Sequence, residues 1–262
     1  MTPRECLIYF ALKFNGDYRM IRNAIIDKEQ PDIDFLPPTK FKALTILDDD
    51  YPEYFKSIMF APIVIFYYGD ISLIKDLNKN LAVVGARRPT TYGADVTRYL
   101  VKNIVRKGVN IVSGLARGID AIAHQTAINY GGKTIAVLGS GIDFCYPPSN
   151  EELYEEIKKN HLVISEYPGL TEPQPTNFPF RNRLIALLSK TILITDAKYR
   201  SGTSITANYA LQFNRNVCTV PHPIFDVSLC NQLIEEGASL ILSKEDLFEA
   251  MNVNENEPIF EN

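Results

Sequence analysis

Short apolar runs alternate with helix-length segments through most of the chain. Seven runs of four to six residues, rich in Val, Ile and Leu, recur between residues 81 and 242, and stretches of helical period separate them. Strands that alternate with helices in this way form a parallel sheet with helices on both faces, so the pattern predicts a doubly wound α/β domain. We expect its strands at residues 81–84, 109–112, 133–138, 162–165, 191–195, 217–220 and 239–242.

The first 80 residues do not follow this alternation. Residues 4–14 and 17–29 predict two short helices, and the Pro- and Asp-rich residues 30–40 predict a linker. A strand-like run at 63–68 leads into the main domain. We therefore divide the chain into a small helical N-terminal module with its linker (1–40), a lead-in that packs on the sheet (41–80), a main domain (81–251), and a polar, acidic tail that we expect to be disordered (252–262).

Charge and composition restrict the kind of partner. The 262 residues carry a formal net charge of -4, with 27 Lys and Arg against 31 Asp and Glu. A nucleic-acid site on this chain must therefore be a local basic patch. The four cysteines are far apart and the three histidines do not cluster, which favours reduced thiols in a cytoplasmic protein without a metal or cofactor. We expect no signal peptide and no membrane span, because the run at 63–68 is far too short to cross a bilayer.

Basic residues and glycines directly follow several of the predicted strands. All strands of a parallel sheet end on one edge, here called the strand-end edge, and open α/β sheets bind their ligands beyond it. Guanidinium groups beside glycines favour a ligand that carries phosphate, so we expect a nucleotide or a nucleic acid there. The strand ends carry Gly85, Arg87 and Arg88; Ser113, Gly114 and Arg117; Gly139, Ser140 and Gly141; Glu166; Lys198, Arg200, Ser201, Gly202 and Thr203; and His222.

A Pro-rich loop after the fourth strand adds residues 177–183 to this edge, with two aromatic and two basic side chains. Phe178 and Phe180 are as compatible with core positions as with stacking on bases. Each glycine turn is also compatible with an ordinary tight turn, and each arginine with a surface ion pair. Because the same chemistry recurs at five strand ends, we favour a binding site.

Motifs of common nucleotide enzymes are absent from the chain. In Gly85-Ala-Arg87 an arginine stands where a dinucleotide-binding turn needs its second glycine. The sequence has no Gly-x-x-x-x-Gly-Lys-Ser/Thr loop, no serine nucleophile elbow, and no general base with a convincing partner. We therefore expect no catalytic residue and no enzyme activity.

Six motifs follow one another in the main domain. They are Gly85-Ala-Arg87, residues 113–120, residues 132–143 with Tyr146-Pro147, residues 165–168, residues 177–183 and residues 197–203. Over about residues 44–245 this series resembles the DprA/Smf family of DNA-processing proteins. The resemblance implies an extended Rossmann-like, mostly parallel sheet that binds single-stranded DNA, forms a homodimer, protects incoming DNA and loads RecA recombinase in natural transformation. The DNA-contacting residues that it implies are Arg87, Arg117, Phe180, Arg181, Arg183, Lys198 and Arg200.

Two positions depart from the family pattern. His222 stands where the family usually has a glycine after Val-Pro, and Leu229 stands where it has a glycine before Cys-Asn, so the loop 222–230 is left open by the resemblance. A two-fold dimer is the commonest closed homo-oligomer. We expect its contact within residues 206–242, where apolar residues are dense, namely Leu211, Phe213, Ile224, Phe225, Leu233 and Ile234.

Two other functions remain alternatives. Nucleotide-processing hydrolases of a related fold place glycine and glutamate motifs on the same edge, although the run that starts at Arg200-Ser-Gly lacks the downstream glutamate of those enzymes. A nucleotide sensor would bind a mononucleotide that an oligonucleotide does not displace.

Overall fold

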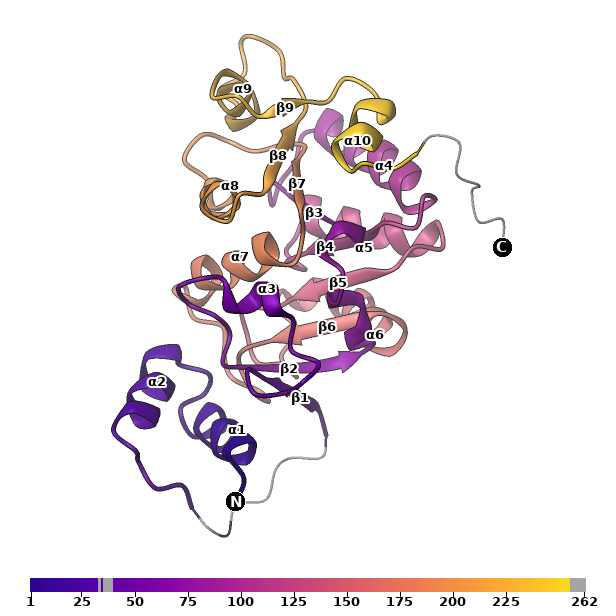
Figure 1. Cartoon of the computed structure of the whole chain (residues 1–262). Coiled ribbons are helices and arrows are strands. Elements are labelled where there is room, and N and C mark those ends of the chain that lie inside the picture. The colour runs from indigo at the N-terminus through magenta and orange to yellow at the C-terminus, as the bar shows by residue number, and fades with distance from the viewer. Residues whose placement is uncertain (33, 35–39, 255–262) are drawn as a thin grey trace.

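One mixed sheet forms the centre of the molecule (Figure 1). The computed structural model describes residues 1–32, 34 and 40–254, and within these residues nine strands are ordered β1-β2-β6-β5-β4-β3-β7-β8-β9. The seven predicted strands are present and parallel, so the doubly wound, mostly parallel α/β fold is confirmed. They are β3 (Asn80–Val84), β4 (Asn110–Ser113), β5 (Thr134–Val137), β6 (Leu162–Ser165), β7 (Thr191–Ile194), β8 (Asn216–Thr219) and β9 (Ser239–Leu240).

The lead-in extends the sheet, whereas the sequence predicted that it packs on it. Strand β2 (Val64–Gly69) pairs antiparallel with β6 and with β1 (Lys42–Thr45). Successive side chains of a strand point to opposite faces, and both Ile65 and Phe66 are fully buried. The segment is therefore covered on both faces, as a member of the sheet must be. The rest of the lead-in forms α3 (Glu53–Lys56), η1 (Ile71–Ile74) and η2 (Leu77–Lys79).

Helices cover both faces of the sheet. The side chains of β3 alternate between the faces: Ala82 and Val84 pack in one apolar cluster, and Leu81 and Val83 pack in another. The helices that share the first cluster are α7 (Asn177–Leu187), α8 (Gly202–Gln212) and α9 (Leu229–Glu235). The helices on the other face are α4 (Thr91–Val105), α5 (Ile119–Asn129), α6 (Glu151–Asn160), which the short η3 (Pro148–Asn150) precedes, and α10 (Lys244–Ala250) (Figure 1).

Helix α7 starts earlier than predicted. The sequence indicated a loop at 177–183 and a helix around 183–189, but the helix already begins at Asn177. Pro179 is compatible with this start because it lies in the first turn, where a backbone N–H has no partner within the helix. The motif 177–183 is therefore presented by a helix, which fixes the direction of each of its side chains.

Two helices, α1 (Pro3–Lys13) and α2 (Tyr18–Ile26), form the predicted N-terminal pair. The turn between them contacts the main domain through Gly16, whose φ is 78° and whose missing Cβ would lie 2.4 Å from the Glu166 carbonyl oxygen. The predicted linker and tail lie partly outside the described residues, at 33, 35–39 and 255–262. None of the described helices is long and apolar enough to cross a membrane.

Replacing Gly16 with Ala should destabilise the protein, because it adds left-handed strain of about 1 kcal/mol and a clash with the Glu166 carbonyl. Gly131→Ala is the matched control: its φ is 75°, but a Cβ there meets nothing within 4 Å. We expect a larger loss of thermal stability for Gly16→Ala in a calorimetric melt. Equal losses would show that the docking of the turn contributes nothing.

Candidate nucleic-acid interface

The strand order reverses beside β3. Strands β4, β5 and β6 lie on one side of it and β7, β8 and β9 on the other, so the ends of β3 and β7 flank the switch point where open α/β sheets bind ligands. Five exposed cations follow the adjacent strands β4, β3 and β7: Arg117, Arg87, Arg88, Lys198 and Arg200. Within the described residues none of the five forms an ion pair with a carboxylate. They are therefore available to an anionic ligand.

Asp196 fixes the backbone around the switch point. Its carboxylate oxygen Oδ2 accepts hydrogen bonds from the Thr90 backbone N–H at 2.7 Å and from Thr90 Oγ1 at 2.8 Å. Its backbone carbonyl accepts from Ala86 N at 2.7 Å. A Cβ on Gly85 would lie 2.6 Å from that carbonyl oxygen, so the close approach requires glycine. The turns that carry Arg87 and Lys198 are thus held to each other.

The turn before α8 has the features of an anion site. Arg200 has a φ of 55°, which is a strained, left-handed backbone conformation. No side chain caps the following helix, and Ser201 Oγ is buried without a hydrogen-bond partner among the described residues. Gly202 is exposed, and Thr203 is buried in the first turn. Uncapped N–H groups and the helix dipole at this position favour a phosphate.

The turn at Gly114 is closed by protein groups. Gly114 N donates to Asp120 Oδ2 at 3.1 Å, and Ser113 Oγ donates to the Val83 carbonyl at 2.6 Å. Arg181 Nη1 donates to the carbonyls of Gly114 at 2.8 Å and of Val137 at 2.5 Å. These contacts leave the turn without an N–H for a phosphate at Gly114.

The sequence had suggested that Arg181 is an exposed phosphate contact. The structure instead places it in the interior. The residue is 5% exposed, and its guanidinium fills the space in front of Gly114, where a Cβ would lie 2.7 Å from it. Burial lowers the pKa of Arg181 to about 10, with the neighbouring Asp120 opposing the shift, so it stays charged at neutral pH. Burial also raises the pKa of Asp120, against the effect of Arg181. The pair supports the turn that carries Arg117.

The turn at 139–141 is closed as well. A Cβ on Gly139 would lie 2.8 Å from the Phe178 ring. Ser140 Oγ donates to the Phe144 carbonyl at 2.8 Å, and Gly141 N donates to the Thr171 carbonyl at 2.7 Å. These residues serve packing and the loop after β6, so of the three predicted glycine turns only the one at 201–203 keeps an open cradle.

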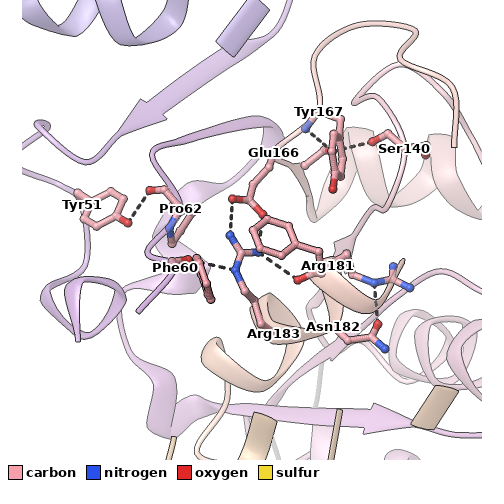
Figure 2. A network of polar contacts seen from close by, with 11 residues as sticks. Tyr51, Phe60, Pro62, Ser140, Glu166, Tyr167, Arg181, Asn182 and Arg183 are labelled. Atoms are coloured by element: carbon pink, nitrogen blue, oxygen red, sulfur yellow. Dashed lines mark hydrogen bonds and ion pairs between the residues drawn. The ribbon is translucent and has the colours of Figure 1, made fainter. Parts of the chain in front are cut away.

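Arg183 lies in the interior, which corrects the expectation that it is exposed on the edge. Figure 2 shows its guanidinium facing Glu166, with both Nη atoms 2.6 Å from the two carboxylate oxygens. Its Nε donates to the Phe60 carbonyl at 3.1 Å, and Nη1 also donates to the Phe180 carbonyl at 3.1 Å. Arg183 is 1% exposed. Four of its five N–H groups are therefore engaged, and none of them faces solvent.

The aromatic side chain beside the cations is Phe178. The Arg87 guanidinium lies 5.7 Å from the Phe178 ring centroid, and the half-exposed Tyr146 ring lies 5.6 Å from it. Phe180, which the resemblance implied near DNA, instead packs against Tyr18 and Phe60 at the junction with the N-terminal helices. Tyr146 belongs to the motif series, but it was not selected as a contact because it follows β5 by nine residues, beyond the strand end that the sequence pattern marks.

His222 is held in a defined position close to the edge. The backbone N–H of His222 donates to Asn231 Oδ1 at 2.9 Å, and Asn231 Nδ2 donates to the His222 carbonyl at 3.1 Å. These two hydrogen bonds give the loop 222–230 a defined start. Its Nε2 lies 3.0 Å from the Thr195 carbonyl, and its ring meets the Tyr92 ring at 5.3 Å. A hydrogen bond with the Cys230 side chain raises the pKa of His222 to about 8, against the effect of its burial.

The other two histidines are structural. His124 is fully buried with Nδ1 2.6 Å from Thr134 Oγ1, and burial lowers its pKa to about 3. Burial also lowers the pKa of His161. In the part of the chain that the structure describes, no three His, Cys, Asp and Glu side chains are grouped so that they could hold a metal ion.

Known proteins match the chain over this same domain. The family model of DNA recombination-mediator protein A covers residues 42–252. The chain belongs to this family. It is 41% identical to DNA processing protein DprA of Bacillus subtilis over 220 residues, which are 82% of this chain and 74% of the relative. It is 42% identical to Protein Smf of Synechocystis over 212 residues, which are 79% of this chain and 53% of the relative, so it spans about half the length of that protein.

Two solved structures of DprA-family proteins share the fold. DNA processing protein A of Streptococcus pneumoniae superimposes with a TM-score of 0.76 and 35% identity, over 93% of this chain and 92% of that one. The Helicobacter pylori protein, described for its single-stranded DNA binding mode, gives a TM-score of 0.74 and 29% identity, over 82% of this chain and 99% of that one. The Rossmann-like fold and the membership in the DNA-processing family are thereby confirmed.

Replacing Arg183 with Ala should destabilise the fold by about 3–5 kcal/mol, because it leaves the Glu166 carboxylate buried without its partner. Arg88→Ala, which removes an exposed charge, should change stability by less than about 0.5 kcal/mol. Urea denaturation followed by circular dichroism measures both. Similar midpoints for the two variants would contradict a structural role of the buried pair.

Proposed function

We propose that the protein binds single-stranded DNA along the strand-end edge. The observation that carries this proposal is the set of five exposed cations, without ion pairs among the described residues, on three adjacent strand ends. The Helicobacter pylori relative, which shares the fold and is described for single-stranded DNA binding, supports the same ligand.

The edge has groups that suit both the phosphates and the unpaired bases of a single strand. Arg87, Arg117, Lys198 and Arg200 contact phosphates, and the turn at 201–203 offers N–H groups to one of them. Phe178 and Tyr146 stack on unpaired bases. Duplex DNA keeps its bases stacked inside, so it gains only the phosphate contacts. Neither phosphate contacts nor stacking read base edges, and we infer that the protein has little sequence preference.

We further propose that the protein acts by binding and not by catalysis. A hydrolase of related fold needs a free glutamate on this edge, but both carboxylate oxygens of Glu166 are held by Arg183. Incubation with nucleoside monophosphates should therefore release no free base. If the protein instead bound a mononucleotide and oligothymidine did not displace it, this result would favour a nucleotide sensor.

The loop between β8 and α9 carries exposed apolar residues that suit contact with a second copy of the chain. Ile224, Phe225 and Val227 are 88%, 95% and 80% exposed. Leu211 and Leu242 are also exposed, whereas Leu233, predicted as a contact, lies buried in the core. We propose a cytoplasmic homodimer that protects incoming single-stranded DNA and passes it to RecA recombinase. The dimer and RecA loading follow from the family resemblance, and the exposed apolar loop supports the dimer.

Removing two edge cations should weaken DNA binding through charge. For Arg87→Ala with Lys198→Ala, the slope of log affinity against log salt for oligothymidine should become shallower by about 1.4, since each phosphate contact on a single strand contributes about 0.7. The unchanged protein should prefer oligothymidine to duplex of equal length. Fluorescence anisotropy over a salt series measures both quantities.

The matched control is Lys79→Ala with Lys190→Ala. These two exposed lysines precede β3 and β7, so the control removes the same charge from the opposite ends of the same two strands. Its salt slope should stay unchanged. Equal slopes for both double variants, or equal affinity of the unchanged protein for duplex, would place the DNA site elsewhere.

Replacing Phe225 with Asp should dissociate the dimer, because it places a charge in the apolar contact. In sedimentation experiments at micromolar concentration, the unchanged protein should have twice the monomer mass of 29.6 kDa, and the variant should have the monomer mass. Met59→Asp is the control, since Met59 is 86% exposed on the lead-in. A monomeric unchanged protein would refute this assignment.

A further inference from the structure

A groove of about 650 Å³ lies between helices α4, α5 and α6 and is separate from the strand-end edge. The helices that form it cover one face of the sheet (Figure 1). Its walls combine exposed aromatic rings, cations and uncharged amides. The lining includes Tyr99 and Lys102 of α4, Gln125 and Asn129 of α5, Tyr130, and Ser149 before α6.

The aromatic rings of the groove are accessible and accompanied by cations. Tyr99 is 50% exposed and Tyr130 is 40% exposed. Lys102 Nζ lies 5.0 Å from the Tyr130 ring centroid, and Arg106 Cζ lies 5.2 Å from it. Neither cation forms an ion pair with any residue that the structure describes. Exposed rings beside free cations are the elements of a surface that binds single-stranded nucleic acid.

The charge on the lining favours an anionic occupant. Arg98 and Lys102 line the groove against a single carboxylate, Glu152. Arg98 is paired with Asp95 at 2.8 Å, so Lys102 and the adjacent Arg106 supply the charge that remains open to a ligand.

One end of the groove opens onto the strand-end edge. Arg117, one of the five edge cations, donates from Nε to Ser149 Oγ at 3.3 Å, and Ser149 lines the groove. Asn150 donates to the Leu115 carbonyl at 2.9 Å and so holds the two segments together. The 11 residues of α5 then extend the path by about 16 Å, from Arg117 at the helix start to Tyr130 at its end.

We propose that this groove is a second single-stranded DNA subsite, into which a strand continues after it passes Arg117. Lys102 and Arg106 contact its phosphates, and Tyr99 stacks on a base. This inference rests on the proposed function of the strand-end edge. A peptide is the alternative occupant, but the continuity with the edge through Arg117 favours the strand that already lies there.

The test compares oligothymidines of two lengths. A strand of about six nucleotides occupies only the edge, whereas one of about twenty, longer than most single-domain sites, also reaches the groove. For Lys102→Ala with Arg106→Ala, the salt slope for the long strand should become shallower by about 1.4, and the slope for the short strand should not change. Tyr99→Ala should weaken binding of the long strand at least about fivefold, and Tyr99→Phe, which keeps the ring, should restore it.

The outcomes separate this inference from the proposal on which it rests. If the unchanged protein binds both lengths and the variants match it at both, the groove is not a DNA subsite and its occupant is of another class. An equal loss at both lengths also overturns the inference, because the groove would then belong to the edge site. If the unchanged protein binds neither length, the proposed function itself fails. Lys79→Ala with Lys190→Ala controls for lost charge, and thermal melts control for folding.

Discussion

The candidate site depends on the contact between the ends of β3 and β7 that Asp196 makes. The two strands are neighbours in the sheet, where Leu81 pairs with Thr191, 110 residues further along the chain, and each strand ends in a turn that carries cations. Like charges on adjacent turns repel, so the turns need a fixed connection. Asp196 supplies it through its backbone carbonyl, which accepts from Ala86, and through its carboxylate, which accepts twice from Thr90. The cations are thereby positioned before any ligand arrives.

The arginines of the family motifs have two different tasks. Arg87 and Arg117 are exposed, whereas Arg181 and Arg183 are buried and bind protein carbonyls and Glu166. A buried guanidinium is stable only where its donors are engaged, and four N–H groups of Arg183 meet this requirement. The buried arginines hold α7 and the turn at Gly114 in place, so they support the surface on which the exposed arginines lie.

The fold was predictable from the sequence, and the exposure of the site residues was not. Buried parallel strands are continuous apolar runs, so seven strands and their shared edge follow from the hydrophobic pattern. Charge is visible in a sequence but burial is not, and Arg183 therefore looked equivalent to Arg87. The predicted loop at 177–183 was wrong, because this segment forms the start of α7, whose first turn accepts Pro179. The contact between Phe178 and Tyr146 was also not predictable, because the two residues are far apart in the sequence and only the fold brings their rings together.

Because the chain is acidic overall, a strand of nucleic acid can be attracted only by a local group of cations. The net charge of -4 gives the chain as a whole no attraction for phosphates, and exposed charges act over a screening length of about 8 Å at physiological salt. A strand is therefore attracted only where cations stand without carboxylate partners. Such a cluster raises the free energy of the unbound protein, because its like charges repel one another. Phosphates bound at this edge would reduce the repulsion, so the proposed complex would gain free energy from the arrangement that destabilises the unbound protein.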